Sequence, residues 1–253
     1  KLLPGRRIAA KLWVDRLGDV HRALGFKQCV GFRQFFYHSE KELTCEVHMD
    51  DIHGTGPIDQ LPAAIAELRG IFDLKASDTI RVGRYSHLKR ERLRLENGDV
   101  MIRPSVKYVN DMVALLEMED AKVVASPSLL EDRPEDDEEL TAEGARVFRS
   151  VVGIALNVMP DRPDIQRDVQ ILTRNLRSPT AFDKRRLVKL VRYLKGTKTF
   201  GMLMQKPKGV KGRVLLELYS DTDFAGCKDT RRAMTCGVTH LDKTVTSVFA
   251  RRQ

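Results

Sequence analysis

The stretch Leu43-Thr44-Cys45-Glu46-Val47-His48-Met49-Asp50-Asp51 decides how the first part of this chain is expected to fold. Apolar and polar residues alternate along it, which puts Leu43, Cys45, Val47 and Met49 on one face. This alternation is typical of a half-buried strand. Two acids follow, and after them come Ile52 and the turn-prone residues 54–57. The pattern therefore predicts a strand, an acidic turn and a second short strand.

The adjacent carboxylates Asp50 and Asp51 are the first candidates for chemistry. Like charges at the tip of a hairpin repel each other unless a cation lies near them. Nucleotidyl transfer uses such a cluster, because two Mg²⁺ ions held by hard oxygen ligands bridge the attacking hydroxyl and the triphosphate. An exposed Asp-Asp turn without a function is a common alternative, so the dipeptide alone does not decide between the two.

The rest of the chain contains further helical and extended patterns. Apolar residues at helical spacing predict helices over residues 7–24, 61–72, 105–118, 141–159, 164–176 and 181–194. Extended patterns predict a hairpin over residues 80–102, with Asn97-Gly98 at its turn, and strands over 214–219, 234–240 and 245–250. Thr180 or Asp183 can cap the last helix. These elements predict an α+β fold.

Charge is distributed unevenly over the 253 residues, whose formal net charge is +9. Residues 131–139 contain seven acids and one Arg, so the rest of the chain is more strongly basic. We interpret residues 126–139 as a solvated linker that is too charged to pack. A basic body suits a phosphate-binding protein, although many basic proteins bind no nucleic acid.

The sequence also indicates where the protein is expected to work. No apolar run reaches the ~20 residues that cross a bilayer, and the first residues do not resemble a signal peptide. The four cysteines form no Cys-x-x-Cys motif, so we expect reduced thiols in an intracellular protein, in a cytoplasmic particle or the nucleus, that is neither secreted nor bound to a membrane. Cys45, His48 and His53 match no standard zinc spacing, and we expect no zinc there.

A series of motifs resembles the reverse transcriptase and RNase H region of copia-type LTR retrotransposon polyproteins. The matching stretches are Leu3-Pro4-Gly5-Arg6-Arg7-Ile8-Ala9-Ala10-Lys11-Leu12-Trp13, Gly25-Phe26, Val47-His48-Met49-Asp50-Asp51, Phe148-Arg149-Ser150-Val151-Val152-Gly153, Arg162-Pro163-Asp164-Ile165, Arg192-Tyr193-Leu194-Lys195-Gly196-Thr197 and Tyr219-Ser220-Asp221-Thr222-Asp223-Phe224-Ala225-Gly226. No single stretch is decisive, but together they follow the order of the family along nearly the whole chain.

The resemblance implies a division of the chain into three parts. A partial reverse-transcriptase palm would occupy residues 1–104 and would include a hairpin similar to a primer grip. A helical thumb and connection would occupy residues 105–200, with the acidic linker at 126–140. The first strands of a truncated RNase H-like domain would occupy residues 201–253.

The resemblance also implies a chemistry for the intact polyprotein. Asp50 and Asp51 look like the paired metal-binding acids of the palm. Asp221 looks like the first metal-binding Asp of RNase H, and Asp223 looks like a structural or turn acid. The cofactor would be Mg²⁺ at a two-metal site that is incomplete in this chain. The partners would be an RNA template with a DNA primer, or an RNA–DNA hybrid, a dNTP and the rest of the polyprotein.

Two sets of basic residues are candidates for phosphate contacts. On the hairpin they are Arg81, Arg84, Lys89, Arg90, Arg92 and Arg94, and on the last helix they are Lys184, Arg185, Arg186, Lys189, Arg192 and Lys195. A solvated basic surface explains both sets equally well.

The sequence departs from the pattern of the family in ways that weaken the expectation of activity. His48 stands where the family usually has Tyr, Asp161 replaces a Thr, and the Ser/Thr-rich turn near residues 231–235 is degraded. The upstream palm Asp and the later RNase H acids of the family fall outside the chain. We therefore expect it to be inactive alone.

Three functions consequently stay open. The first is an enzyme fragment, an RNA-directed DNA polymerase with the start of RNase H that works within a longer polyprotein. The second is a non-catalytic nucleic-acid-binding relic, either decayed or co-opted. The third is a protein-binding scaffold, which would require the ordered motif matches to be accidental.

Overall fold

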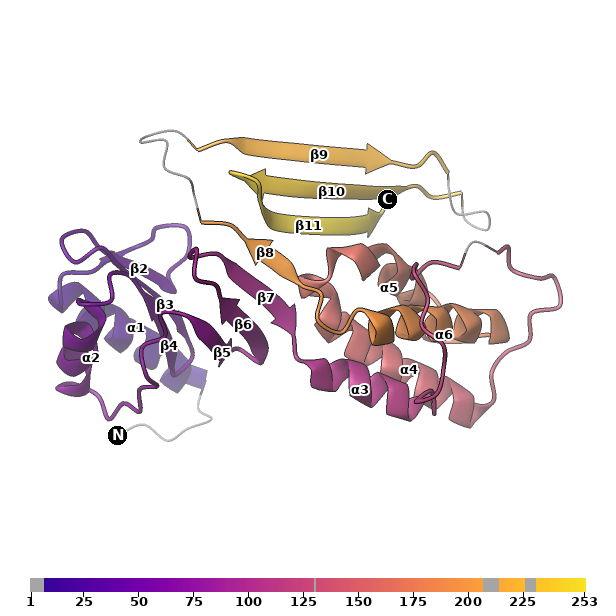
Figure 1. Ribbon diagram of the computed structural model, residues 1–253, viewed down its shortest axis with the longest axis horizontal. Coiled ribbons are helices and arrows are strands. Elements are labelled where there is room, and N and C mark those ends of the chain that lie inside the picture. The colour runs from indigo at the N-terminus through magenta and orange to yellow at the C-terminus, as the bar shows by residue number, and fades with distance from the viewer. Residues whose placement is uncertain (1–6, 130, 207–213, 226–230) are drawn as a thin grey trace. The chain divides into compact units, whose positions relative to one another are not determined.

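The computed structural model describes residues 7–129, 131–206, 214–225 and 231–253 (Figure 1). Its helices and antiparallel sheets confirm the predicted α+β class. By compactness the chain divides after Arg81 into two units, each of which is described by itself below. The division falls near the start of the predicted hairpin, so most of the hairpin belongs to the second unit. The three-part division into domains stays a prediction.

The first unit is an antiparallel sheet with two helices. The strands β1 (Lys27–Gln28), β2 (Phe35–His38), β3 (Leu43–His48) and β4 (Asp51–Thr55) lie in chain order in the sheet. The helices are α1 (Arg7–Ala23) and α2 (Leu61–Arg69), as the apolar spacing predicted. The elements that lead to and from the acidic turn are therefore consecutive neighbours in space as well as in sequence.

Both helices pack on the same face of this sheet. Phe36 and Cys45 lie in one apolar cluster with Ala64 of α2. From α1, the buried His21 stacks on Phe36 with ring centroids 4.4 Å apart. Burial lowers the pKa of His21, so the ring is neutral at physiological pH and packs as an aromatic group. The opposite face of the sheet is covered by neither helix.

The first strand of the acidic hairpin ends one residue earlier than predicted. His48 pairs with Asp51, so Met49 and Asp50 form a two-residue turn. Met49 is 68% exposed and has a φ of 58°, which is uncommon for a residue other than glycine. The alternation assigned Met49 to the buried face, and that prediction is wrong because the chain reverses before the side chain can point inward.

The second unit begins with a four-stranded antiparallel sheet. Its strands are β5 (Gly83–His87), β6 (Arg90–Arg94), β7 (Val100–Pro104) and β8 (Met202–Met204). The predicted hairpin therefore contains two turns. Asn97-Gly98 lies between β6 and β7 as predicted, whereas the turn at Leu88-Lys89 was not predicted. Both residues of that turn have positive φ, which sequence rules expect at Gly or Asn.

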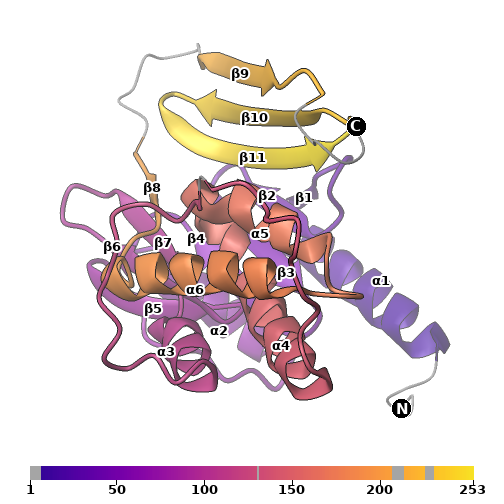
Figure 2. The same ribbon diagram turned by 90° about the vertical axis from the view of Figure 1, so that its right-hand side faces the viewer.

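Four helices form the body of the second unit (Figure 2). They are α3 (Val106–Leu115), α4 (Ala142–Val158), α5 (Gln166–Thr173) and α6 (Ala181–Gly196). Single 3₁₀ turns at Met159–Asp161 and Pro163–Ile165 join α4 to α5. All four helices contribute to one apolar core. None of the helices in the described ranges has the length and apolar character needed to span a membrane.

A capping box starts α6, as the sequence allowed. The Thr180 hydroxyl accepts a hydrogen bond from the Asp183 amide, and the Asp183 carboxylate accepts one from the Thr180 amide. Each side chain thereby satisfies one of the amide groups that a helix start leaves without a helical partner. This arrangement fixes the first turn of α6.

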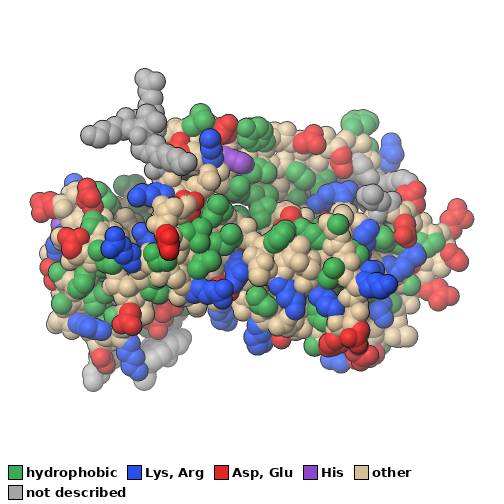
Figure 3. All heavy atoms as spheres, viewed as in Figure 1, with side chains coloured by type: hydrophobic (Ala, Val, Ile, Leu, Met, Phe, Trp, Pro, Cys, Tyr) green, Lys and Arg blue, Asp and Glu red, His purple; other side chains and the backbone are tan. Residues whose placement is uncertain are grey.

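A three-stranded antiparallel sheet completes the second unit. Its strands β9 (Leu216–Thr222), β10 (Met234–Leu241) and β11 (Thr244–Arg252) confirm the three strands predicted near the end of the chain. β11 packs against α5 and β8 (Figures 1 and 2). Leu216 and Leu218 on β9 are more than half exposed, and hydrophobic side chains are visible on this sheet in Figure 3.

The acidic stretch packs against the helical body, contrary to the prediction of a solvated linker. Arg133 forms ion pairs with Asp137 at 3.0 Å and with Asp183 at 2.8 Å. The Asp137 carboxylate also accepts a hydrogen bond from the amide of Phe182. Charge composition alone could not reveal the contacts with Phe182 and Asp183, because those residues lie at the start of α6. Only part of the stretch is free to act as a solvated connection.

Candidate metal and nucleic-acid sites

The paired acids lie at the tip of the hairpin between β3 and β4. Asp50 is the second residue of the turn, and Asp51 is the first residue of β4. Both are exposed. The hairpin therefore presents two adjacent hard oxygen donors to solvent, which is the donor type that Mg²⁺ prefers.

Trp13 of α1 holds the backbone of this turn. Its indole Nε1 donates a hydrogen bond to the carbonyl oxygen of Met49 at 2.8 Å. Its ring also packs edge-on against Phe72, with centroids 5.5 Å apart. The sequence marked Trp13 only as part of a family motif and gave no sign of this contact, because its partner is a main-chain atom.

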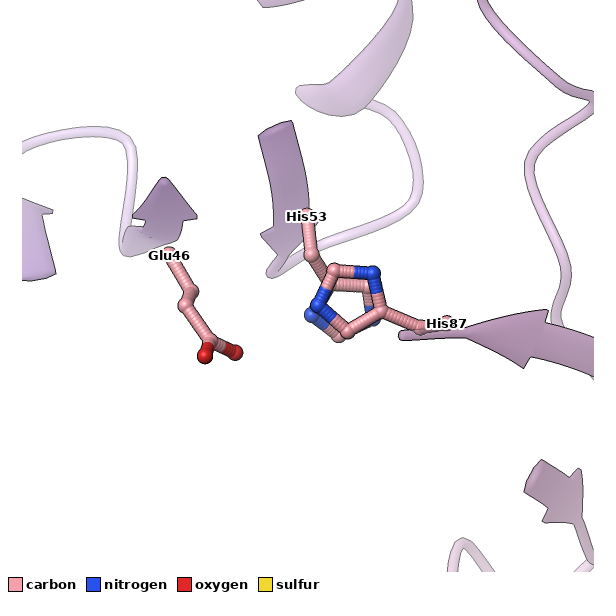
Figure 4. Close-up of side chains that lie close together, drawn as sticks. All are labelled: Glu46, His53 and His87. Atoms are coloured by element: carbon pink, nitrogen blue, oxygen red, sulfur yellow. The ribbon is translucent and has the colours of Figure 1, made fainter. Parts of the chain in front are cut away.

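The strand pairing places Asp51 on the face of the sheet that faces away from the helices. Ile52, the next residue, packs toward the core. Further along β4, His53 lies opposite Glu46 of β3, and both side chains extend to the same side (Figure 4). The third side chain labelled there, His87, ends β5 of the second unit. Side chains of directly paired residues share one face.

The same alternation places Cys45 on one face of the sheet and the histidines His48 and His53 on the other. Cys45 points into the core and is 5% exposed, whereas His48 and His53 belong to the opposite face. Burial raises the pKa of the Cys45 thiol to about 11, so it stays protonated near neutral pH. The inward-facing thiol and the two imidazoles on the opposite face therefore do not converge on one site.

The basic residues predicted to contact phosphate lie in different surroundings. Arg81 belongs to the first unit, and the others lie on β5, on β6 or in the turn between them. Arg84 lies 3.7 Å from Glu91, and Arg90 forms an ion pair with Asp161 at 3.0 Å. Lys89 is exposed in the turn. The hairpin is thus only partly available to an external phosphate.

Asp161 is the buried partner that holds the side chain of Arg90 in place. Its side chain is 2% exposed and lies in the 3₁₀ turn after α4. Burial raises the pKa of Asp161, and the guanidinium groups of Arg90 and Arg92 lower it only in part. This ion pair fastens the hairpin to the helical body.

Asp221, the candidate RNase H acid, is an exposed residue of β9. It lies opposite Cys236 of β10. Two residues later, the Asp223 carboxylate accepts a hydrogen bond from the Met234 amide at 2.6 Å. This contact gives Asp223 a structural role, one of the two that the sequence predicted for it. The last residue of the motif, Gly226, lies outside the described residues.

Two of the motifs that resemble the family interlock in the second unit. Arg162 is 1% exposed and binds both carboxylate oxygens of Asp164, at 2.9 and 2.7 Å. It also donates to the backbone and side-chain oxygens of Thr197. The Tyr193 hydroxyl donates to Asp164 at 2.6 Å. The Arg-Pro-Asp segment and the Arg-Tyr-Leu segment therefore form one polar network.

This network determines how its acid and its phenol ionise. Burial by itself would raise the pKa of Asp164, but hydrogen bonds from Arg162 and Tyr193 outweigh it and hold the pKa below its usual range. The pKa of Tyr193 is raised by burial and by its bond to the Asp164 carboxylate. Asp164 is therefore charged and Tyr193 is neutral at physiological pH.

Several basic side chains of α6 contact groups within the chain. Arg192 donates to the Lys122 carbonyl at 2.5 Å, and Lys195 donates to the carbonyls of Glu119 and Ala121. Arg186 lies 4.4 Å from the ring centroid of Phe182. Basic and acidic side chains are interspersed on the face seen in Figure 3. Lys184 and Arg185 at the start of the helix are exposed.

Comparison with known proteins identifies the relatives of the chain. It is 26% identical over 232 residues to the retrovirus-related Pol polyprotein from transposon RE1 of Arabidopsis thaliana, and 25% identical over 232 residues to the one from transposon RE2. Each match covers 90% of this chain and 15% of the relative. The uncharacterized mitochondrial protein AtMg00810 of the same plant is 35% identical over 106 residues, which are 42% of each chain.

The chain is thus homologous to retrovirus-related Pol polyproteins. Within that class, its resemblance to the copia-type retrotransposon polyproteins is confirmed. It spans less than half the length of each of these relatives. No family model matches the chain. No solved structure matches it.

Proposed function

We propose that this chain is the reverse-transcriptase part, with the beginning of RNase H, of a copia-type Pol polyprotein. The observation that carries the proposal is the exposed pair Asp50 and Asp51 at a hairpin tip, in a chain homologous to Pol polyproteins along nine tenths of its length. The first unit would contribute to the palm, the helical body would be the thumb and connection, and the last sheet would open the RNase H domain.

The acidic turn fits the metal that this function implies. Both carboxylates are exposed, so each can turn its oxygens toward a Mg²⁺ ion. The bound metals would supply charge stabilisation for nucleotidyl transfer to a primer end. The chain itself would hold the turn in place, because Trp13 fixes the carbonyl of Met49 just before the two acids. Asp221 on β9 would be a ligand of a separate RNase H metal site.

The surface charge supports an RNA template and a DNA primer as partners. The chain is basic overall, and Arg84 and Lys89 on the β5–β6 hairpin and Lys184 at the start of α6 are exposed. Exposed cations gain affinity for nucleic acid by releasing counterions from phosphates. Arg90, which is ion-paired with Asp161, would instead position the hairpin.

Primer extension by a Pol polyprotein that carries this chain tests the proposal. Asp50→Asn and Asp51→Asn should each abolish Mg²⁺-dependent extension, while the matched surface variant Asp59→Asn should leave it intact. Binding of an RNA–DNA hybrid to the chain should weaken steeply as salt rises. Hybrid binding without extension by an otherwise intact polyprotein would favour the non-catalytic relic, and absence of both would reject the proposal.

A further inference from the structure

The uncovered face of the β1–β4 sheet carries an aromatic pair. Along β2, Phe36 and His38 are buried, whereas Phe35 and Tyr37 are 36% and 46% exposed. Residues two apart in a strand point to the same side. Both rings therefore lie on the face that α1 and α2 leave uncovered.

The strand register places these rings on the same face as the candidate metal acid. Phe35 lies opposite Glu46, which lies opposite His53. Asp51 precedes His53 by two residues on β4 and so shares its side of the sheet. One face thus presents two exposed aromatic rings on β2 and a carboxylate at the start of the edge strand β4.

The surroundings of the aromatic pair are basic and slightly hollowed. Lys27 pairs with Tyr37 across the sheet, and Arg33 lies in the loop before Phe35. Neither cation forms a salt bridge with any residue in the described part of the chain. A hollow of about 220 Å³ is lined by Lys27, Cys29, Phe35, Tyr37 and Thr44, among others. At its edge, Phe32 is 62% exposed and contacts the Phe35 ring edge-on.

Exposed aromatic rings next to cations suit one class of ligand. Every nucleobase has a π face, so rings on an open sheet can stack unpaired bases while nearby cations contact the phosphates. A base-paired duplex hides these faces within its own stack. If an apolar protein partner covered this face, Lys27 and Arg33 would be buried without acidic groups to pair with. The charges therefore favour a polyanion as the ligand.

We propose that the outer face of the β1–β4 sheet binds single-stranded nucleic acid, with unpaired bases stacked on Phe35 and Tyr37. This inference rests on the proposed function, because the bound strand would be the unpaired template leading to Asp51. It adds to that function a specific stacking surface made by side chains outside the acidic turn. Lys27 and Arg33 contact phosphates of the same strand.

Fluorescence anisotropy of a labelled deoxythymidine oligonucleotide, titrated with the whole chain at low salt, tests this inference. Tyr37→Ala and Phe35→Ala should each weaken binding by about 10-fold, since one stacking contact is removed. Tyr37→Trp should preserve or tighten binding. Phe224→Ala is the matched control, because Phe224 is a 95% exposed aromatic residue in the second unit. Circular dichroism checks that each variant is folded.

The outcomes separate this inference from the proposed function. If both alanine variants bind the oligonucleotide as tightly as the wild type, the stacking surface is refuted while the proposed function stands. The same conclusion follows if the wild type binds an RNA–DNA hybrid but not the oligonucleotide. If the wild type binds neither nucleic acid at low salt, both proposals are rejected.

Discussion

The indole Nε1 of Trp13 donates a hydrogen bond to the carbonyl oxygen of Met49, and this contact ties the first helix to the turn that presents Asp50 and Asp51. The turn needs such support, because Met49 adopts a left-handed φ that a residue other than glycine rarely takes. A side chain from a distant helix thus stabilises the geometry of a site that it does not enter.

Trp13→Phe should loosen this turn. The ring contact with Phe72 is largely kept, but the hydrogen bond to Met49 is lost, and we expect a cost of about 0.5–1 kcal/mol in the free energy of unfolding. Hydrogen exchange should accelerate at amides 47–52 and remain unchanged in α4. Equal exchange rates in both proteins would show that the indole does not hold the turn.

The network around Arg162 should not tolerate a lysine. Arg162→Lys keeps the charge but cannot bind both oxygens of Asp164 and Thr197 at once, so we expect a loss of about 2 kcal/mol in the free energy of unfolding. Urea denaturation measures this loss. Arg149→Lys, an exposed change on α4, is the control and should cost little.

The buried Asp161 predicts a specific pH dependence. Its folded-state pKa is raised, so the folded protein takes up the proton more readily than the unfolded chain does. Wild type should therefore gain stability relative to Asp161→Asn as the pH falls through the raised pKa toward the ordinary value near 4. Urea denaturation between pH 4 and pH 7 measures the difference. A difference that is constant with pH would contradict the raised pKa.

Asp164 should show the opposite trend, because its folded-state pKa is lowered. Its contribution is present above the ordinary pKa and is lost as the pH falls through the lower folded value. Comparing wild type with Asp164→Asn below pH 4 isolates this effect. The two aspartates, which lie three residues apart, should thus change stability in opposite directions on acidification.

Arg133→Ala should release the acidic stretch. The substitution removes ion pairs to Asp137 and to the buried Asp183, so limited proteolysis between residues 131 and 139 should be several times faster. Arg146→Ala is a matched control, because the Arg146–Glu143 pair is exposed on both sides. Similar cleavage rates in the two variants would mean that the stretch is not fastened by Arg133.

The cysteines should differ in reactivity. Cys45 is buried with its thiol pKa raised to about 11, whereas Cys29 is exposed. Iodoacetamide at pH 8 should therefore modify Cys29 within minutes and leave Cys45 intact, as peptide mass spectrometry can measure. Both should react in urea. Modification of native Cys45 at the rate of Cys29 would contradict the packing of β3.

The sequence predicted the structure correctly where the residues of one segment determine the conformation of that segment. The strand before Asp50, the turn at Asn97-Gly98 and the Thr180 cap all follow from neighbouring residues, and the structure confirms them. It failed where a distant partner decides the conformation. The turn at Leu88-Lys89 has no glycine to indicate it, and β8 joins its sheet from a remote part of the chain.

At the candidate site, too, features set by neighbouring residues could be predicted and features set by distant partners could not. The two acids and their turn could be predicted from the strand pattern, but the supporting Trp13 could not, since its partner is a carbonyl group. The basic residues could be listed from the sequence, yet their availability could not. Arg90 and Arg192 point to partners within the chain that no local pattern indicates.

The interlocking of Arg162, Asp164, Tyr193 and Thr197 also has an evolutionary consequence. A copy of the gene that loses the arginine leaves the aspartate without its bidentate partner, and the tyrosine hydroxyl then supports a weakened site. Once the arginine is lost, selection to keep the other residues of the network relaxes. Among diverging copies, the two short motifs should therefore persist together or disappear together, and a lineage that keeps only one of them has begun to lose this part of the fold.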